Sequence, residues 1–405
     1  MEKYLSNLVN IWLNVGINVQ PKQILYVTIP LEYASLREII DEKAEQLEVA
    51  NVIYQFTDGY DQLLEKYSND YQNYDKYLEE ITKNKINLLK HNCVFFEAKR
   101  GIDYYDECKK DELGELKNIE KKYNILFRNK KREIGNVVSC KTVIPTQYWA
   151  ESIFPKEKNP LDKLWEIYFQ ITLANVDDAI DKWNQRINNI QNRVKYLDLQ
   201  QFKSLIFITR KSRLDVELVE NHKWTGGCEI TNTGIRYMPN FPTQEIFTAP
   251  KKTGITGIMC NTKPLCYGGR IIDDFQLNFE NGKVIDYYPK DNHSIIDEII
   301  NLDESNHYPG EIAILPGETE ISKTCVVFQS TLLDENAACH LALGCAYPCS
   351  INHETKFEKE EFEKLGLNYS NYHIDVMFGD DSITIQAISK NNEIKLLMEN
   401  GEWRV

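Results

Sequence analysis

The first half of the chain alternates between helical and strand patterns of apolar residues. Residues 4–15 carry apolar side chains at helical spacing, and further helices are predicted over 31–47 and over the polar segment 60–90. Buried strands are predicted where short apolar runs occur, at 23–29, 50–56, 93–96 and in a segment that ends at 144–146. Because strands and helices alternate, this half predicts an α/β layer built on a parallel sheet.

The pattern changes in the second half. A long helical region from 161 to 199, broken near Asn175, precedes a predicted strand at 202–209. The chain is then rich in strand patterns, and the pairs Asn281-Gly282 and Asn400-Gly401 are strong hairpin signals. We therefore predict an α/β N-terminal domain over 1–205. An α+β, mostly antiparallel C-terminal domain over 206–405 follows it.

One stretch of the second domain, residues 334–348, combines small residues with a histidine. We predict a short helix over 334–343, with Asp334 as its N-cap and Gly344 as its stop. The helical neighbours of His340 are mostly small, so the imidazole would be accessible to a ligand. A core histidine bonded to a carbonyl is the alternative for a single such residue.

Composition and charge exclude several classes of function. The chain has 405 residues, a net charge of −14 and 42% hydrophobic residues, typical of a folded, acidic protein with two domains. Binding to nucleic acid or to an anionic membrane is not expected at this charge. No apolar run is long enough to span a bilayer and the N-terminus is not typical of a signal peptide, so we predict a cytoplasmic protein.

The ten cysteines are scattered without CxxC pairs and are interpreted as reduced thiols. Cys339, Cys345 and Cys349 flank His340, and a structural zinc site there is a minor alternative because their spacing is unusual for one. No glycine-rich phosphate-binding motif occurs, so a nucleotide-binding role has no local support.

Ionisable residues interrupt apolar segments at four places in the second domain. Taken singly, each could be a surface residue or a structural ion pair. Together they comprise three glutamates, one aspartate and two histidines: Glu245, Glu311, Glu335, His340, His373 and Asp375. His373 and Asp375 lie two apart in a predicted strand and therefore share a face.

Carboxylates and imidazoles without thiolates are suited to Zn²⁺, Co²⁺, Mn²⁺ or Mg²⁺. Six such side chains are enough for two divalent metal ions if one carboxylate bridges them. A pair of ions can activate a water and polarise a carbonyl, which is the chemistry of hydrolysis. The residues therefore predict a two-metal hydrolase.

These segments also resemble a known family, the thermophilic-type metallo-aminopeptidases of the aminopeptidase T and aminopeptidase S kind. The similar stretches, in chain order, are 239–250, 262–269, 310–313, 333–340, 346–348 and 373–375. They cover about a third of the chain in the expected order, and the likeness extends weakly upstream.

The resemblance implies an enzyme that removes N-terminal residues from short peptides with two metal ions. It implies Glu245, Glu311, Glu335, His340, His373 and Asp375 as the metal set, with Glu245 catalytic as well. Tyr347 is implied as a hydrogen-bond donor to the tetrahedral intermediate, and a homodimer is implied. Cys266 and Cys339 stand where small hydroxyl residues are expected, which leaves substrate preference open.

Two alternatives remain at this point. The same site with a different pocket would hydrolyse another amide or an ester. A binding or scaffold protein could keep the fold without catalysis, although a complete ligand set argues against that.

Overall fold

The computed structural model describes residues 1–102, 107–288, 293–352 and 358–405. The chain forms two compact units. Unit 1 comprises residues 1–183 and 228–242, and unit 2 comprises 184–227 and 243–405. The chain thus passes between the units more than once. The domain boundary near residue 205 stays a prediction, since these units are defined by packing and not by independent folding.

Unit 1 is built on a parallel sheet, as the alternation of strands and helices predicts. Its strands in the described residues have the order β2-β1-β3-β4, and all three pairings are parallel. Their bounds are β1 Ile24–Pro30, β2 Asn51–Thr57, β3 Cys93–Arg100 and β4 Ser139–Ile144. The order reverses direction between β1 and β3, which makes this edge of the sheet a topological switch point.

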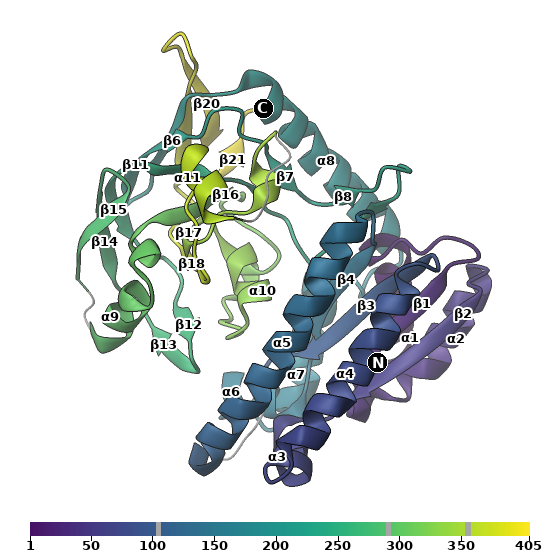
Figure 1. Ribbon diagram of the computed structural model, residues 1–405. Helices are drawn as coiled ribbons and strands as arrows, with labels where there is room; N and C mark the ends of the chain where they lie inside the picture. Colours follow the sequence, from purple (N-terminus) through teal and green to yellow (C-terminus); the bar gives the residue numbers. More distant parts are fainter. Residues whose placement is uncertain (103–106, 289–292, 353–357) are drawn as a thin grey trace. The chain divides into compact units, whose positions relative to one another are not determined.

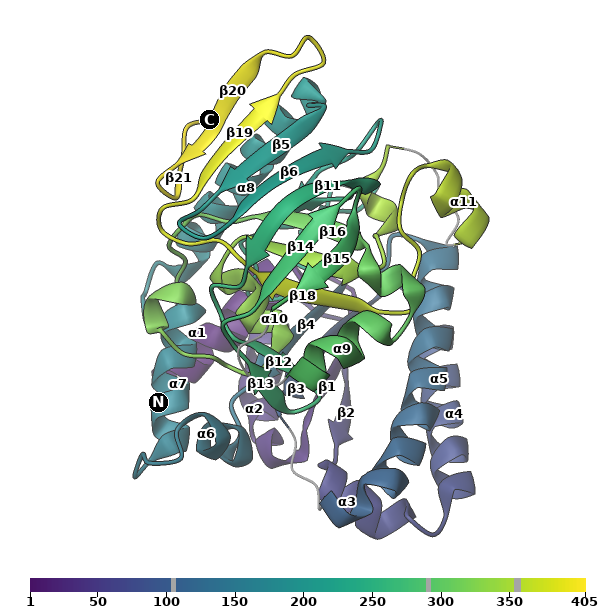
Figure 2. The ribbon, with the colours of Figure 1, turned by 90° about the vertical axis from the view of Figure 1, so that its left-hand side faces the viewer.

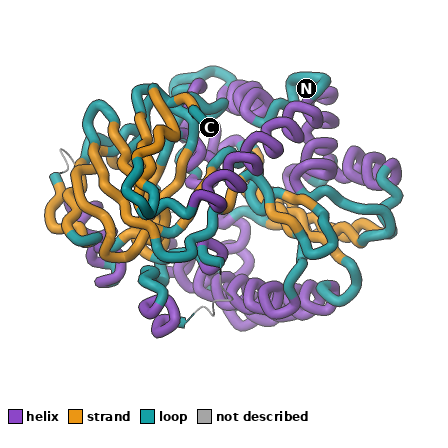
Figure 3. Tube along the Cα trace, turned by 90° about the horizontal axis from the view of Figure 1, so that it is seen from above, coloured by secondary structure: helices purple, strands orange, loops and turns teal. Residues whose placement is uncertain are grey.

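Helices flank both faces of this sheet, and Figure 3 shows them on either side of the strands. Helices α4 and α5 lie together over one face (Figure 1), while α1 and α2 pack with each other on the opposite face. The helices of this part of the chain are α1 Glu2–Ile11, α2 Leu36–Gln46, α3 Tyr60–Tyr67, α4 Tyr71–Leu88, α5 Lys110–Ile134, α6 Gln147–Ile153, α7 Pro160–Ile171 and α8 Ala179–Gln200. The break predicted near Asn175 is confirmed, because α7 and α8 are separate helices.

Two short strands, β8 Glu229–Ile230 and β9 Arg236–Tyr237, form a hairpin in the second segment of unit 1. All other later strands belong to unit 2. Their bounds are β5 Ser204–Ile208, β6 Arg213–Leu218, β7 Thr225–Gly226, β10 Ile246–Thr248, β11 Pro250–Cys260, β12 Leu265–Tyr267, β13 Arg270–Ile272, β14 Gln276–Glu280, β15 Lys283–Tyr287, β16 Pro309–Ile314, β17 His340–Gly344, β18 His373–Met377, β19 Thr384–Ile388, β20 Ile394–Glu399 and β21 Glu402–Trp403. Most of α8 belongs to this unit as well, and the later helices among its described residues are α9 His293–Asn301, α10 Thr331–Asp334 and α11 Lys359–Lys364.

Most strands of unit 2 form two antiparallel sheets, and β12 and β13 pair separately with each other. Over the described ranges one sheet has the order β15-β14-β11-β6-β5-β19-β20-β21, and Figure 2 shows most of these strands side by side. The other has the order β18-β17-β16-β10-β7. A single apolar cluster contains buried residues from both sheets, and Phe207 of β5 meets Phe378 edge to face at 5.6 Å. Both predicted hairpins are confirmed, since Asn281-Gly282 and Asn400-Gly401 have positive φ and join paired strands.

The predicted helix over 334–343 is wrong. Helix α10 ends at Asp334, a single 3-10 turn covers residues 335–337, and the chain then enters strand β17 at His340. This strand lies between β16 and β18 and pairs with both. Sheet pairing on two sides therefore overrides the helical preference of the alanines and leucine in this stretch.

The described residues contain no helix that is long and apolar enough to cross a membrane. The cytoplasmic location stays a prediction.

Candidate metal centre

Three neighbouring strands of the smaller sheet in unit 2 bring four of the predicted site residues together. In the register, Ala342 of β17 lies opposite both Glu311 of β16 and Asp375 of β18, and Gly344 lies opposite His373. Because alternate residues of a strand share a face, His340 lies on the same face as Ala342. Glu311, His340, His373 and Asp375 therefore project from one face of the sheet.

Small residues at the centre of this face keep space open. Ala342 and Gly344 are the β17 positions between the ionisable side chains, and neither carries a long side chain. Gly344 has a φ of 103°, and a Cβ there would lie 2.4 Å from the carbonyl oxygen of Tyr372. The close approach of β17 and β18 at His373 therefore requires glycine at this position.

The two remaining carboxylates come from short connecting segments. Glu245 directly precedes β10, and a Cβ on Gly226 of β7 would lie 2.3 Å from its carbonyl oxygen. Glu335 begins the 3-10 turn after α10. The side chain of buried Asn336 accepts a hydrogen bond from the Gln244 amide at 2.8 Å, so the two segments are tied together beside their carboxylates.

The imidazoles and carboxylates form two overlapping groups. The Nε2 atom of His340 lies 3.3 Å from a Glu245 oxygen and 3.5 Å from Glu311 Oε1. The Nε2 atom of His373 lies 3.3 Å from Asp375 Oδ1 and 3.8 Å from Glu311 Oε2. In each group the candidate ligand atoms lie within 4.8 Å of one another, and Glu311 belongs to both.

Backbone carbonyls orient both imidazole rings through hydrogen bonds to their Nδ1 atoms. The Nδ1 atom of His340 is 3.1 Å from the Ala338 carbonyl oxygen, and that of His373 is 2.8 Å from the Cys345 carbonyl oxygen. A carbonyl only accepts, so each Nδ1 carries the proton and each Nε2 is directed at the carboxylates with its lone pair available in the neutral ring. This orientation is typical of histidine ligands to metals.

Two carboxyl groups of the site, those of Glu311 and Glu335, have raised pKa values because they are buried close to other carboxylates. Burial raises the pKa of Glu311, and the charges of Glu245 and Asp375 raise it further against the two histidines. Burial followed by the same two charges raises the pKa of Glu335 well above its ordinary value. Glu335 belongs to neither of the two ligand groups, but the turn that begins at Glu335 packs against β18, the strand of His373 and Asp375.

The histidines respond in the opposite sense. Burial alone would lower the pKa of His340, but hydrogen bonds that its protonated ring donates to Glu245 and Glu311 outweigh burial and raise the pKa well above its usual value. At His373 burial is likewise outweighed, mainly by Asp375, and the pKa is about 9. The carboxylates of the site therefore stabilise positive charge on the two imidazoles beside them.

A bound divalent metal fits this donor set. The Glu311 Oε2 atom is buried and has no hydrogen-bond partner, an arrangement that costs free energy unless a cation satisfies it. Four carboxylates beside two imidazoles give a surplus of negative charge that two protonated imidazoles would only half neutralise. Neither group contains a thiol, so the minor alternative of a cysteine zinc site at Cys339, Cys345 and Cys349 finds no support in the described residues.

Tyr347 stands at the edge of the cluster. Its ring centroid lies 4.6 Å from that of His373 and 6.0 Å from that of Phe247. The residue keeps 39% of its surface exposed, which is too much for a core packing role. Desolvation and then the carboxylates, Glu311 first, raise the pKa of Tyr347 well above 10, so its hydroxyl keeps a proton to donate.

Asn336 is the residue of this site whose role the sequence pattern did not indicate. It is fully buried, its carbonyl accepts a hydrogen bond from the Thr319 hydroxyl at 2.9 Å, and its side chain holds the segment of Glu245. The only signal for it is its place directly after Glu335.

A buried set of carboxylates and imidazoles arranged in this way is typical of metal-dependent hydrolases. The chain belongs to the thermophilic metalloprotease family M29, whose model matches residues 1–403. The family resemblance read from the second-domain motifs is thereby confirmed.

Similar proteins cover the whole chain. It is 31% identical to "Aminopeptidase 2" of Geobacillus stearothermophilus, over 99% of this chain and 98% of the relative. It is 29% identical to "Aminopeptidase AmpS" of Bacillus subtilis, over 98% of each chain. Among solved structures, wild-type AmpT from Thermus thermophilus superposes with a TM-score of 0.86 at 25% identity and 100% coverage of both chains.

Proposed function

We propose that this chain uses two divalent metal ions to hydrolyse the N-terminal peptide bond of short peptides. That it is a metal-dependent aminopeptidase, an exopeptidase hydrolase, rests on its family and on relatives that carry this name over its whole length. The observation that supports two ions is the pair of ligand groups that share Glu311. The identity of the ions, Zn²⁺, Co²⁺, Mn²⁺ or Mg²⁺, is an expectation from the donor types.

The ligands would divide between the two ions by proximity. Glu245 and His340 would hold one ion and His373 and Asp375 the other, and Glu311, which belongs to both groups, could contribute to either. We assign Glu335 to the same set because the family resemblance implies it and because its turn packs against β18, which carries two of the other ligands. When bound, such ions lower the pKa of a water and polarise the scissile carbonyl.

The side chains themselves bind the substrate and handle its charges. Glu245 is more open than Glu311 and Asp375, with 13% of its side chain exposed against 5% and 6%. It is therefore placed to accept the substrate ammonium or a proton. The protonated Tyr347 hydroxyl would donate to the oxyanion that forms when the amide is attacked.

The test of the assignment is a matched pair of dipeptide amides, one with a free N-terminus and one acetylated. Acetylation deletes the ammonium charge that the carboxylates bind and adds bulk. We expect the metal-loaded protein to cleave the free peptide and to lose most of its activity on the acetylated one. Equal turnover of the two would exclude an aminopeptidase and favour the alternative, a two-metal hydrolase of other amides or esters.

Two partner predictions accompany this function. Peptides with a free N-terminus are the expected substrates, with little selectivity among apolar first residues. A homodimer is implied by the family resemblance, and light scattering of the purified protein would test it. A catalytically inactive scaffold is the remaining alternative, and it predicts folded protein without peptidase activity after metal loading.

A further inference from the structure

Unit 1 contains a cavity of about 350 Å³ that the hydrolytic centre does not use. It lies between the sheet and the helices α4 and α5, and residues at the carboxyl ends of β2 and β3 line it. Thr28 of β1, Thr57 of β2 and Glu97 of β3 belong to its wall. In open parallel sheets, ligands bind outside the carboxyl ends of the strands where the strand order reverses, and this cavity occupies that place.

Glu97 lies in the cavity wall on β3, and its charged neighbours are lysines, one of which, Lys141, lies outside the lining of the cavity. Glu97 and Lys99 share a face of β3, and their charged atoms are 3.6 Å apart. Lys141, the β4 partner of Glu97 in the sheet, lies 4.0 Å from its other oxygen. One carboxylate thus stands between two ammonium groups. Burial raises the pKa of Glu97, but these lysines outweigh it and hold the pKa below its ordinary value.

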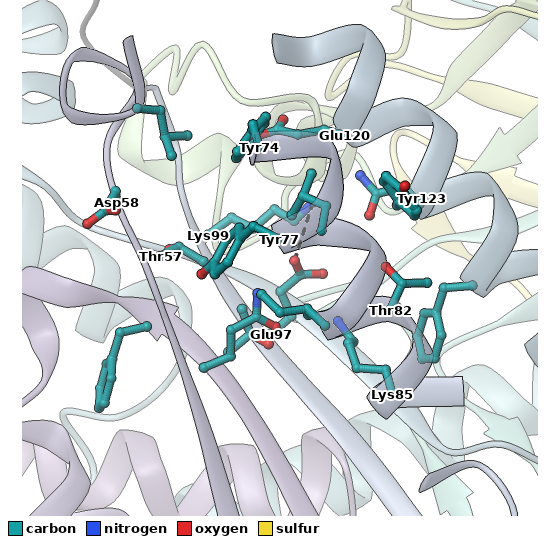
Figure 4. A pocket seen from close by; sticks show the side chains of 18 of the residues that line it. Thr57, Asp58, Tyr74, Tyr77, Thr82, Lys85, Glu97, Lys99, Glu120 and Tyr123 are labelled. Atoms are coloured by element: carbon teal, nitrogen blue, oxygen red, sulfur yellow. Dashed lines mark hydrogen bonds and ion pairs between the residues drawn. The ribbon is translucent and has the colours of Figure 1, made fainter. Parts of the chain in front are cut away.

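Lys85 of α4 adds a further positive charge. Figure 4 shows its side chain and that of Glu97 extending into the same cavity. Its Nζ atom lies 5.3 Å from the ring centroid of Tyr26 and 4.9 Å from that of Phe127. Within the described ranges, no hydrogen bond or ion pair reaches this ammonium group. Burial lowers the pKa of Lys85, as expected for a charge that lacks a full partner.

Aromatic and apolar side chains of α4 continue the wall away from Lys85. Tyr77, Leu78 and Ile81 line it, and Tyr77 keeps 42% of its surface exposed. At the far end the Tyr74 hydroxyl donates to Glu120 at 2.6 Å. Tyr74 and Lys85 are eleven positions apart on α4, which is about 16 Å along the axis. The cavity therefore has a cationic end, an apolar wall and an acidic end.

This layout favours one type of ligand. Among the described basic residues that line the cavity, Lys99 and Arg100 each have a carboxylate within ion-pair distance and Lys85 does not, so a single negative charge is sufficient there. The carboxylates of Glu97 and Glu120 would repel a second negative charge. We propose that this cavity binds a small monocarboxylate with an aromatic or branched apolar group, held by Lys85 at its charged end and by Tyr77 along its apolar part. The proposal goes beyond the peptidase function and does not depend on it.

The probe is N-acetylphenylalanine, compared with its amide, which has the same ring but no charge. Acetylation keeps either compound from being processed as a free amino acid. Binding to the metal-loaded protein is measured by titration calorimetry, and its place by amide hydrogen exchange. We expect the acid to bind at least tenfold more tightly than the amide and to slow exchange in residues 71–88. An acetylated tripeptide ending in phenylalanine distinguishes a peptide C-terminus from a free acid as the source of the carboxylate.

Variants of α4 separate this cavity from the metal centre, which also attracts carboxylates. Lys85→Met should weaken binding of the acid by at least tenfold, and Lys85→Arg should restore part of it. Lys83→Met is the matched control, since Lys83 pairs with Glu79 on the same helix outside the cavity and its loss should change nothing. Equal binding of acid and amide, unchanged binding in folded Lys85→Met, or protection confined to unit 2 would overturn the proposal. The peptidase activity of the parent protein is measured separately, and its presence or absence does not decide whether the cavity binds the acid.

Discussion

The two units each enclose a cluster of charged side chains, and the clusters have opposite signs. In unit 2 four carboxylates accompany two imidazoles, and Glu311 approaches both rings. In unit 1 several lysines surround one carboxylate, and Glu97 approaches two ammonium groups. Burial acts alike on both glutamates. At Glu311 burial prevails and the pKa is raised, because the charges of Glu245 and Asp375 oppose the lowering by the two histidines. At Glu97 the lysines outweigh burial and the pKa is lowered.

This difference shows what each cluster lacks. A buried excess of carboxylates is stabilised by a cation, and with imidazoles present the best match is a divalent metal. A buried excess of ammonium groups is stabilised by an anion. The same residue type can therefore belong to a metal centre or to an anion site, and the neighbours decide which.

The largest effect is expected from removing the cation that unit 2 attracts. A chelator should abolish peptidase activity, and Co²⁺, Zn²⁺ or Mn²⁺ should restore it. His340→Ala should lose bound metal and activity together, because a methyl group cannot replace an imidazole ligand. Elemental analysis and peptide hydrolysis measure the two. Full activity in metal-free protein would remove the contrast between the two clusters.

The next effect concerns the neutral donor beside the carboxylates. Tyr347→Phe should lower kcat by roughly 10²–10³, the scale for losing one oxyanion donor. Metal content should stay at the parent value, since the hydroxyl is not among the proposed ligands. Steady-state kinetics with metal analysis test this. An unaltered kcat would leave Tyr347 as a residue that only packs against His373.

The α/β layer of unit 1 could be predicted because its strands are short apolar runs whose helices alternate with them at regular spacing. The conformation of residues 334–343 could not be predicted in the same way. Asp334, three alanines and Gly344 give a good local helix pattern, and only the pairing of β17 with strands distant in sequence decides otherwise. Local propensity is a weak prior against two neighbouring strands.

The candidate site, too, could be predicted from the sequence only in part. The types of its six ionisable residues and the family motifs indicated them from the sequence alone, and their roles as ligands stay a prediction. That Glu311 belongs to both groups depends on the register of β16, β17 and β18, which no local pattern encodes. The role of Asn336 depends on a hydrogen bond across 92 residues of chain.

A smaller effect is therefore expected at Asn336, which positions the metal cluster without belonging to it. Asn336→Ala removes the acceptor for the Gln244 amide and frees the segment of Glu245. We expect metal affinity to fall by roughly 10–100-fold, as for other residues that orient ligands. Activity should recover when metal is added in excess, which a loss of the ligand itself would not allow. Metal titrations of activity distinguish the two.

The smallest effect tests whether the lysine-rich cluster of unit 1 costs stability without an anion. Burial lowers the pKa of Lys131 on α5 to about 8, and Lys141 lowers it further against Glu97 and Glu229. The folded state therefore binds fewer protons than the unfolded state between pH 8 and about 10.5, and stability should rise with pH across that window.

Below pH 8 the charged Lys131 lowers the free energy of unfolding, by at most about 3 kcal/mol for a pKa shift of this size. Lys131→Met removes this cost and also the hydrogen bond to the Ser139 hydroxyl at 2.7 Å, so we expect a net gain of about 1–2 kcal/mol at pH 7. The gain should shrink toward pH 10, where the parent lysine is neutral when folded. Denaturant unfolding at both pH values measures it, with Lys130→Met, whose lysine pairs with Glu133 on the surface, as control. A variant less stable than the parent at pH 7 would show that the lysines of this cluster are already compensated, and the contrast with the carboxylates of unit 2 would fail.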